Sequence, residues 1–251
     1  MARLFVSDVH LGAGFEPAIE QFLGFLGSQA ARAEALYILG DLFESWVGDD
    51  DRSEAAQRVC AALKTLTTGR GVPCFVLHGN RDFLLGQGFA ERTGSILLAD
   101  PVVAELEGER VLITHGDALC SDDHSYQELR SIVRAPDWQR RFLALPLANR
   151  EVLADEARAG SRRHIASTVP TIMDVNEDAV ARAFRAAGVR RMIHGHTHRP
   201  GVHELTIDGA PAQRIVLGAW YEQGSYLSYE RGRYELRSLP RQPTGGTGPS
   251  F

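Results

Sequence analysis

The sequence predicts an α/β fold in which helices flank layered β-sheets. Short apolar runs alternate with amphipathic segments along the chain, which is typical of strands alternating with helices. A length of 251 residues with 44% hydrophobic content is enough to bury the core of one domain. We expect that domain to span residues 1–240. The remainder, 241–251, is rich in Gly, Pro and Thr and is expected to be a disordered tail.

Five of the apolar runs are predicted strands, and each ends in Asp, Asn or His. In chain order they are "RLFVSD", "ALYILGD", "CFVLHGN", "RVLITHGD" and "RRMIHGH". Functional groups in α/β sheets gather beyond the carboxyl ends of strands, because the loops converge there while the strands hold them rigidly. Five strands that deliver polar groups to one edge are therefore expected to build one site.

The polar groups at these strand ends form a set of metal donors. They are Asp8, His10, Asp41, Asn80, His115, His196 and His198. Oxygen and nitrogen donors without sulfur suit Mn²⁺, Fe²⁺ or Zn²⁺. Seven donors exceed the needs of one tetrahedral ion but serve two ions if one carboxylate bridges them. Asp and Asn after a strand often only close a turn, which would explain one such pair but not five coordinated strand ends.

The segment "RMIHGHTHRP" places three histidines within five positions. A single buried histidine is usually a core residue. If Met192 and Ile193 end a strand, alternation predicts that His194, His196 and His198 leave it on the same side. That arrangement suits metal binding.

Composition excludes several other classes of protein. A net charge of −5 and a pI near 6.0 argue against a dedicated nucleic-acid binder. Three cysteines without CxxC spacing support neither a disulfide framework nor a thiolate metal site, which fits a reducing cytosol. From the pattern we expect neither a signal peptide nor a spanning segment.

The stretch from about 122 to 169, between the fourth and fifth strands, is expected to be a helical insertion broken at Pro136 and Pro146. Trp138, Phe142 and Leu145 share one helical face, either as ordinary helix core or as a surface for an apolar ligand. From Arg130 to Thr168, eight arginines and four carboxylates give a net charge of +4. A basic, apolar insertion suits an anionic membrane surface, although a solvated helical face explains the same charges.

The motifs "DVH", "GDLFE", "GNRD", "THGD" and "HGHTH" together resemble the calcineurin-like metallophosphoesterase superfamily. The resemblance implies a layered β-sandwich flanked by helices and a dinuclear metal site. One ion would be held by Asp8, His10, Asp41 and His198. The other would be held by Asp41, Asn80, His115 and His196.

Longer blocks, including "ALYILGDLFESWVGDDD", "HGNRDFLLG" and "IHGHTHRPGVHEL", resemble the UDP-2,3-diacylglucosamine pyrophosphatase family of lipid A biosynthesis. The resemblance implies that water attacks the α-phosphorus to release UMP and 2,3-diacylglucosamine 1-phosphate. It implies two divalent ions, with Mn²⁺ our first choice, and an insertion that caps an acyl groove. It also implies a monomer on the cytoplasmic face of the inner membrane, bound peripherally, with no nucleic-acid partner.

By the same resemblance, the catalytic set adds Arg81 to the seven donors, because its guanidinium can hold phosphate oxygens. The expected substrate contacts are Asn80, Arg81, Asp123, Ser161 and His196. The chain has Ile165 and Thr168 where the family has Asn and Lys, and Arg162, Arg163 or His164 are candidates to compensate. His194 and His78 lie outside the ligand pattern and are expected to be packing or supporting residues.

Two other functions stay open at this point. A different hydrolase of the same fold, such as a cyclic-nucleotide phosphodiesterase, a dinucleotide hydrolase or a nuclease, would share the metal motifs but would not need a long apolar insertion. A non-enzymatic interaction module is expected to have lost metal donors, whereas all seven are present here.

Overall fold

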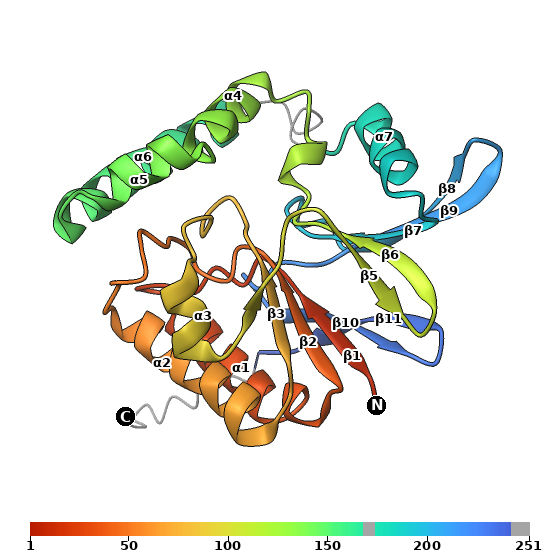
Figure 1. Ribbon diagram of the computed structural model, residues 1–251, viewed down its shortest axis with the longest axis horizontal. Coiled ribbons are helices and arrows are strands. Elements are labelled where there is room, and N and C mark those ends of the chain that lie inside the picture. The colour runs from red at the N-terminus through yellow and green to blue at the C-terminus, as the bar shows by residue number, and fades with distance from the viewer. Residues whose placement is uncertain (168–173, 242–251) are drawn as a thin grey trace, which may run out of the picture.

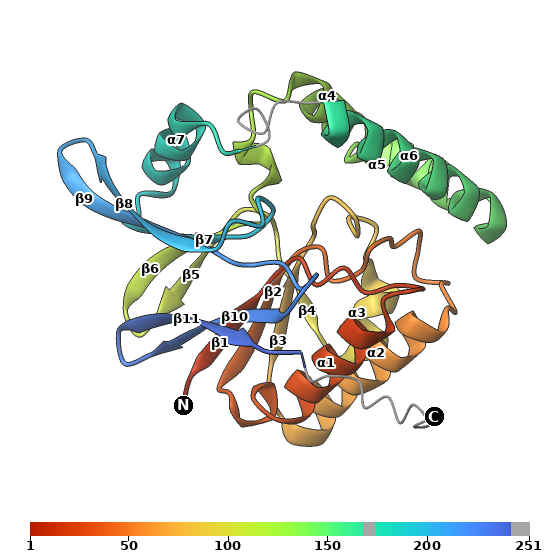
Figure 2. The same ribbon diagram turned by 180° about the vertical axis from the view of Figure 1, so that it is seen from behind.

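Two β-sheets face each other, and helices cover their outer surfaces (Figures 1 and 2). This computed structural model describes residues 1–167 and 174–241, without the side chains of 162 and 164–167. Of the expected tail, only Arg241 lies within the described residues. The predicted α/β sandwich flanked by helices is confirmed.

The first sheet has six strands in the order β11-β10-β1-β2-β3-β4. They are β1 (Arg3–Val6), β2 (Ala35–Leu39), β3 (Cys74–Leu77), β4 (Ile96–Leu97), β10 (Gly224–Glu230) and β11 (Arg233–Leu239). The second sheet has the order β5-β6-β7-β9-β8. Its strands are β5 (Val102–Leu106), β6 (Glu109–Ile113), β7 (Arg191–His194), β8 (Gly201–Ile207) and β9 (Ala210–Val216). Strands β1 to β4 are parallel, as are β6, β7 and β9.

The helices divide between the two outer faces. The first sheet is covered by α1 (Glu16–Gly27), α2 (Glu54–Lys64) and α3 (Gln87–Thr93), and the second by α7 (Glu177–Ala187). Short turns of other helix types are η1 (Ala30–Arg32), η2 (Thr65–Gly69) and η3 (Asp117–Leu119). Helix α7 is capped at its N-terminus by Asn176, whose side chain accepts from the Ala179 amide, and at its C-terminus by Gly188 in the left-handed conformation.

Strand β2 is buried on both faces and contributes side chains to two apolar cores, one beneath the helices and one between the sheets. Leu36 and Ile38 pack toward α1 to α3, whereas Tyr37 and Leu39 pack between the sheets. Side chains of a strand alternate between faces, so an unbroken apolar run is needed where both faces are buried. The run "ALYIL" meets that need and holds the loop after β2 on a rigid base.

The insertion forms an arm above the loops at the carboxyl ends of the central strands (Figures 1 and 2). It consists of α4 (His124–Val133), α5 (Pro136–Leu143) and α6 (Leu147–Ser167). The predicted breaks are confirmed, because α5 begins at Pro136 and α6 directly follows Pro146. Two arginines tie the arm to the loops after β3 and β2: Arg134 donates to the Gly79 carbonyl at 2.9 Å and Arg150 to the Val47 carbonyl at 2.6 Å.

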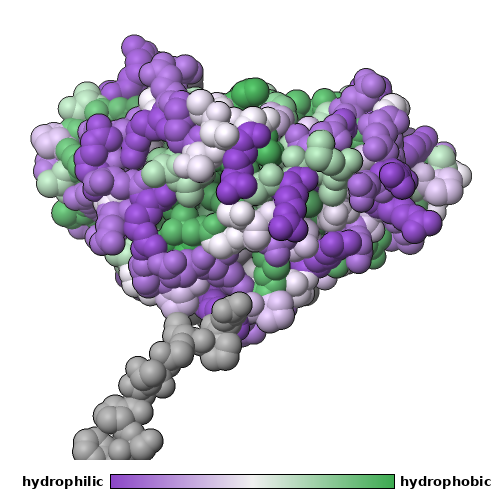
Figure 3. Space-filling view, turned by 90° about the horizontal axis from the view of Figure 1, so that it is seen from below, coloured by the Kyte–Doolittle hydropathy of each residue, from purple (hydrophilic) through white to green (hydrophobic). Residues whose placement is uncertain are grey.

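Large apolar side chains are exposed on this arm. They include Leu129, Ile132, Leu143, Leu145, Val152 and Leu153. The face turned away from the arm is mostly hydrophilic, with apolar surface in small patches (Figure 3). None of the helices in the described ranges combines the length and apolar character needed to cross a bilayer.

Candidate active site

The seven predicted donors come together where both sheets end. Strands β1, β2 and β3 deliver their loops from one sheet, and β6 and β7 deliver theirs from the other. Ligand atoms of Asp8, His10 and His198 lie within 4.8 Å of one another, and so do those of Asp8, Asp41 and His115. Asn80 Oδ1 is 2.9 Å from a ring nitrogen of both His115 and His196. The site therefore lies between two sheets rather than along the edge of one.

Asp41 occupies the centre of this arrangement. Its Oδ2 is 3.8 Å from His10 Nε2 and 3.8 Å from His115 Nε2, although these histidines come from different sheets. Its Oδ1 accepts a hydrogen bond from the Arg81 amide at 2.8 Å. One carboxylate oxygen is thus fixed by the backbone, while the other faces both halves of the site.

The donors share an unusual backbone conformation. Asp8, His10, Asp41, His196 and His198 have φ between 52° and 68°, in the left-handed region. The other non-glycine residues with positive φ in the described chain are Glu107, Asp208 and Arg231, each in a hairpin turn next to a glycine. A residue with a Cβ adopts this region at a cost, and such strain gathers at functional sites. Here it turns five side chains inward from the strand ends.

Two glycines leave room for the central carboxylates. A Cβ on Gly79 would collide with the Asp41 carboxylate, and a Cβ on Gly195 would collide with Ser7 and the Asp8 carboxylate. Side chains at these positions would displace the two acids that face the centre. The glycines in "HGN" and "HGH" therefore belong to the construction of the site.

Hydrogen bonds orient two of the imidazoles. His115 Nδ1 donates to the Leu39 carbonyl at 2.8 Å, and His10 Nδ1 donates to Glu44 at 3.0 Å. The Nε2 atom of each ring therefore points to the centre, where the atoms it faces belong to Asp8, Asp41, Asn80 and His198. Nitrogen and oxygen atoms that converge on one space can all bind a divalent cation placed between them.

The pKa values reflect the same excess of negative charge. Burial by itself lowers the pKa of His115, but the carboxylates of Asp41 and Asp8 outweigh it and raise that pKa to about 9. Burial raises the pKa of the Asp41 carboxyl to about 6. Protons and cations thus compete for these groups near neutral pH.

Further residues support the site and were given no role from sequence. The buried Asp82 carboxylate accepts from the Leu42 and Gly79 amides at 2.8 Å each, tying the loops after β2 and β3 together. The Tyr221 ring stacks on His10 at 5.1 Å and meets His198 edge-on at 5.3 Å. Glu44 and Asp82 lie within the motifs "GDLFE" and "GNRD". Their closeness in sequence to the metal donors could have identified them as supporting residues. Tyr221 directly follows "VLGAW", where no pattern singles it out.

The expectation that three histidines leave β7 on one side is wrong for His194. The strand includes His194, and the backbone then leaves the extended conformation, with positive φ at His196 and His198. The His194 ring bonds to the Gly195 carbonyl at 2.8 Å and lies 3.0 Å from the Arg214 guanidinium. Burial and the Arg214 charge lower its pKa to about 3. His194 is therefore a buried, neutral support for the strand end.

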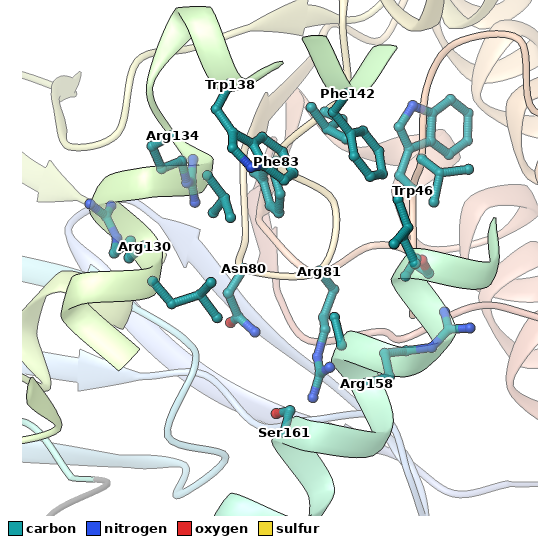
Figure 4. A pocket seen from close by; sticks show the side chains of 18 of the residues that line it. Trp46, Asn80, Arg81, Phe83, Arg130, Arg134, Trp138, Phe142, Arg158 and Ser161 are labelled. Carbon is teal, nitrogen blue, oxygen red and sulfur yellow. The ribbon is translucent and has the colours of Figure 1, made fainter. Parts of the chain in front are cut away.

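A cavity of about 650 Å³ lies between the arm and the metal donors (Figure 4). Asn80, Arg81 and Ser161 line one end of it. Phe83, Trp138 and Phe142 gather at the other, with the rings of Trp138 and Phe142 stacked at 4.8 Å. The cavity is therefore polar beside the metal donors and aromatic farther away.

Arg81 links the cavity to the donors. Its buried Nε has no hydrogen-bond partner in the part of the chain that the structure describes. Burying a guanidinium N–H group without a hydrogen-bond partner costs free energy, and an anionic ligand would supply the missing acceptor. This feature agrees with the phosphate contact expected from sequence.

The other residues expected to contact the substrate do not line the cavity or lie outside the described residues. Asp123 caps α4 by accepting from the Tyr126 amide at 3.1 Å, and it is not among the residues that line the cavity. His196 lies with the metal donors. Arg163 is exposed. Thr168 and the side chains of Arg162, His164 and Ile165 lie outside the described residues.

Comparisons with known proteins identify the family of the chain. The family model for calcineurin-like phosphoesterases matches residues 1–200, and this family implies bound divalent metal ions. The UDP-2,3-diacylglucosamine hydrolases of Escherichia coli K12 and Enterobacter sp. 638 are each 50% identical over 241 residues, covering 96% of this chain and 100% of theirs. A solved archaeal phosphodiesterase is 14% identical with a TM-score of 0.49, covering 95% of this chain and 100% of its own. The chain is therefore a hydrolase of the calcineurin-like phosphoesterase family and belongs to its UDP-2,3-diacylglucosamine hydrolase branch.

Proposed function

We propose that this protein hydrolyses the diphosphate bond of UDP-2,3-diacylglucosamine, giving UMP and 2,3-diacylglucosamine 1-phosphate (lipid X). One observation carries the proposal: the amphipathic cavity meets the metal donors at Asn80 and Arg81. A lipid-linked diphosphate has the same polarity, with charge at one end and acyl chains at the other. The names of the 50% identical relatives support this substrate.

We further propose that the seven donors would hold two divalent ions, with Mn²⁺ our choice. Asp8, His10 and His198 would serve one ion, Asn80, His115 and His196 the other, and Asp41 would serve both. When bound, such a pair supplies Lewis-acid activation of a water and neutralises phosphoryl charge. Mixed carboxylate, amide and imidazole donors suit Mn²⁺ among the first-row ions.

The chain's own side chains then bind and orient the substrate. Arg81 holds non-bridging phosphate oxygens through the nitrogen that otherwise lacks a partner. Ser161 and Arg158, on the facing helix α6, bind the sugar phosphate side. Water attacks the α-phosphorus, and the leaving sugar phosphate is already stable as an anion, so little general acid catalysis is needed. Asp123 adds a contact to the glucosamine end.

The aromatic end of the cavity takes the acyl chains. Each methylene transferred from water into this space contributes about 0.8 kcal/mol. Phe83, Trp138 and Phe142 offer the apolar contact area that a short polar substrate would not use. Binding energy from the chains can orient the diphosphate at the reacting centre.

The arm also provides the contact with the membrane that holds the substrate. Exposed apolar side chains and a net charge of +4 between 130 and 168 suit a peripheral position on the anionic, cytoplasmic face of the inner membrane. In this proposal, residues 1–240 act as one monomeric catalytic domain with its cap at about 122–169.

The test is turnover of three substrates by the Mn²⁺-loaded protein. We expect rapid hydrolysis of UDP-2,3-diacylglucosamine, slow hydrolysis of an unacylated UDP-sugar and little hydrolysis of cyclic AMP. A preference for cyclic AMP, or equal rates on the acylated and unacylated diphosphates, would contradict the proposed function.

A further inference from the structure

A second cavity adjoins the metal donors on the side of His198. Its volume is about 310 Å³, and Tyr221, Glu222, Gln223, Ser225 and Arg237 are among its lining residues. It shares no lining residue with the larger cavity under the arm. The larger cavity meets the donors through Asn80, whereas this one meets them through His198. The two cavities therefore adjoin the same centre through different donors.

The wall of the second cavity is fixed to the metal donors. The loop between β9 and β10 is held at Trp220, whose amide donates to the Asp8 carbonyl at 3.1 Å. The Leu217 amide donates to the His194 carbonyl at 2.8 Å. Next to Trp220, the Tyr221 ring packs on both His10 and His198. The cavity consequently keeps its position relative to the site where a phosphate would lie.

A substrate joined through a diphosphate sends its two halves away from the phosphates in different directions. If the lipid-bearing half enters the cavity under the arm, the nucleoside half needs another recess beside the same centre. The second cavity lies at that place, and its size is at the lower end of the range for small-ligand sites.

The groups lining the cavity suit a pyrimidine nucleoside. The exposed Gln223 amide offers both a donor and an acceptor, which matches the alternating acceptors and N–H of uracil. The exposed Glu222 carboxylate can accept from ribose hydroxyls. Gly218 packs closely against Ser225, because a Cβ there would lie 2.8 Å from Ser225 Oγ.

We propose that this cavity is the subsite for the nucleoside half of the substrate, with Gln223 determining its specificity. The inference rests on the proposed function for the choice of nucleoside. It assigns the two halves of the substrate to separate recesses, one lined by the arm and one by the β9–β10 loop and β11.

The experiment measures competition by UMP and by methyl phosphate on the Mn²⁺-loaded protein, with a chromogenic phosphodiester as reporter. Both compounds offer a phosphate monoester, but only UMP carries a nucleoside. We expect UMP to bind at least tenfold more tightly than methyl phosphate in the wild-type protein. Gln223→Ala should reduce that ratio about fivefold to tenfold, as expected for one or two lost hydrogen bonds. Ala219→Trp, which fills the recess, should reduce it further.

Gln87→Ala is the matched control, since Gln87 is an exposed glutamine on α3 outside both cavities. It should leave the ratio unchanged. Equal binding of UMP and methyl phosphate by the wild-type protein, or a ratio unaffected by Gln223→Ala, would overturn the subsite. Neither ligand contains acyl chains, so this result is independent of whether UDP-2,3-diacylglucosamine is turned over.

Discussion

Replacing Phe142 with Asp tests whether the aromatic end of the larger cavity receives acyl chains. Phe142 lines that cavity, stacks on Trp138 at 4.8 Å and lies half-buried against the apolar core between the first sheet and α1 to α3. The stack is present without substrate, so its loss of about 0.5–1.5 kcal/mol would lower the stability of the arm and not the preference between substrates. Each acyl methylene that loses apolar contact costs about 0.8 kcal/mol, so lost contact with two or three methylenes amounts to about 1.6–2.4 kcal/mol, or about 15- to 60-fold in kcat/KM.

The assay compares kcat/KM on detergent-dispersed UDP-2,3-diacylglucosamine with kcat/KM on a short, water-soluble diphosphate, alongside the Tm. We expect the large loss on the diacylated substrate and less than about a threefold loss on the soluble one. Val202→Asp is the matched control, because Val202 is 49% exposed on β8, outside the arm and outside both cavities. Equal losses on both substrates together with a lower Tm would refute the reasoning and make Phe142 an ordinary core residue.

Three further predictions concern the site and its cap. Asp41→Ala should lower kcat at least about 100-fold and reduce metal content measured by elemental analysis while the circular dichroism spectrum stays folded, because the carboxylate faces both halves of the site. Retained kcat with full metal content would argue against the bridge. Chelation should abolish turnover and Mn²⁺ should restore it. Because the metal-free pKa values are about 9 for His115 and about 6 for Asp41, calorimetry should show proton release on binding and weaker Mn²⁺ affinity at pH 6 than at pH 8. Arg150→Ala removes the bonds from α6 to Asp50 and the Val47 carbonyl, so KM for the diacylated substrate should rise about tenfold, with faster tryptic cleavage of the arm. An unchanged KM would show that this anchor does not position the cap.

Much of the site was predictable because its donors follow strands with strong apolar patterns. The run ending at Asp41 is buried on both faces, so its strand and the polar residue after it are evident from sequence. The prolines at 136 and 146 likewise predicted where the arm's helices begin. Each of these predictions depends only on a few residues that are adjacent in the sequence.

The features that sequence did not predict depend on contacts between distant segments. His194 and His196 have the same local pattern, but only the fold places Arg214 beside the first and Asn80 beside the second. The left-handed backbone occurs at five donors in the loops where the two sheets meet. Asp and His adopt this conformation more readily than most residues, but that preference does not tell which Asp or His will adopt it. Tyr221 reaches His10 across more than 200 positions of sequence, so its role becomes visible only in the structure.

Hydrolysis in ¹⁸O-labelled water tests the central claim most directly. Mn²⁺-loaded protein is incubated with UDP-2,3-diacylglucosamine, and both products are analysed by mass spectrometry. If water attacks the α-phosphorus, one ¹⁸O atom appears in UMP and none in 2,3-diacylglucosamine 1-phosphate. Label in the lipid phosphate, or no release of UMP at all, would contradict the account.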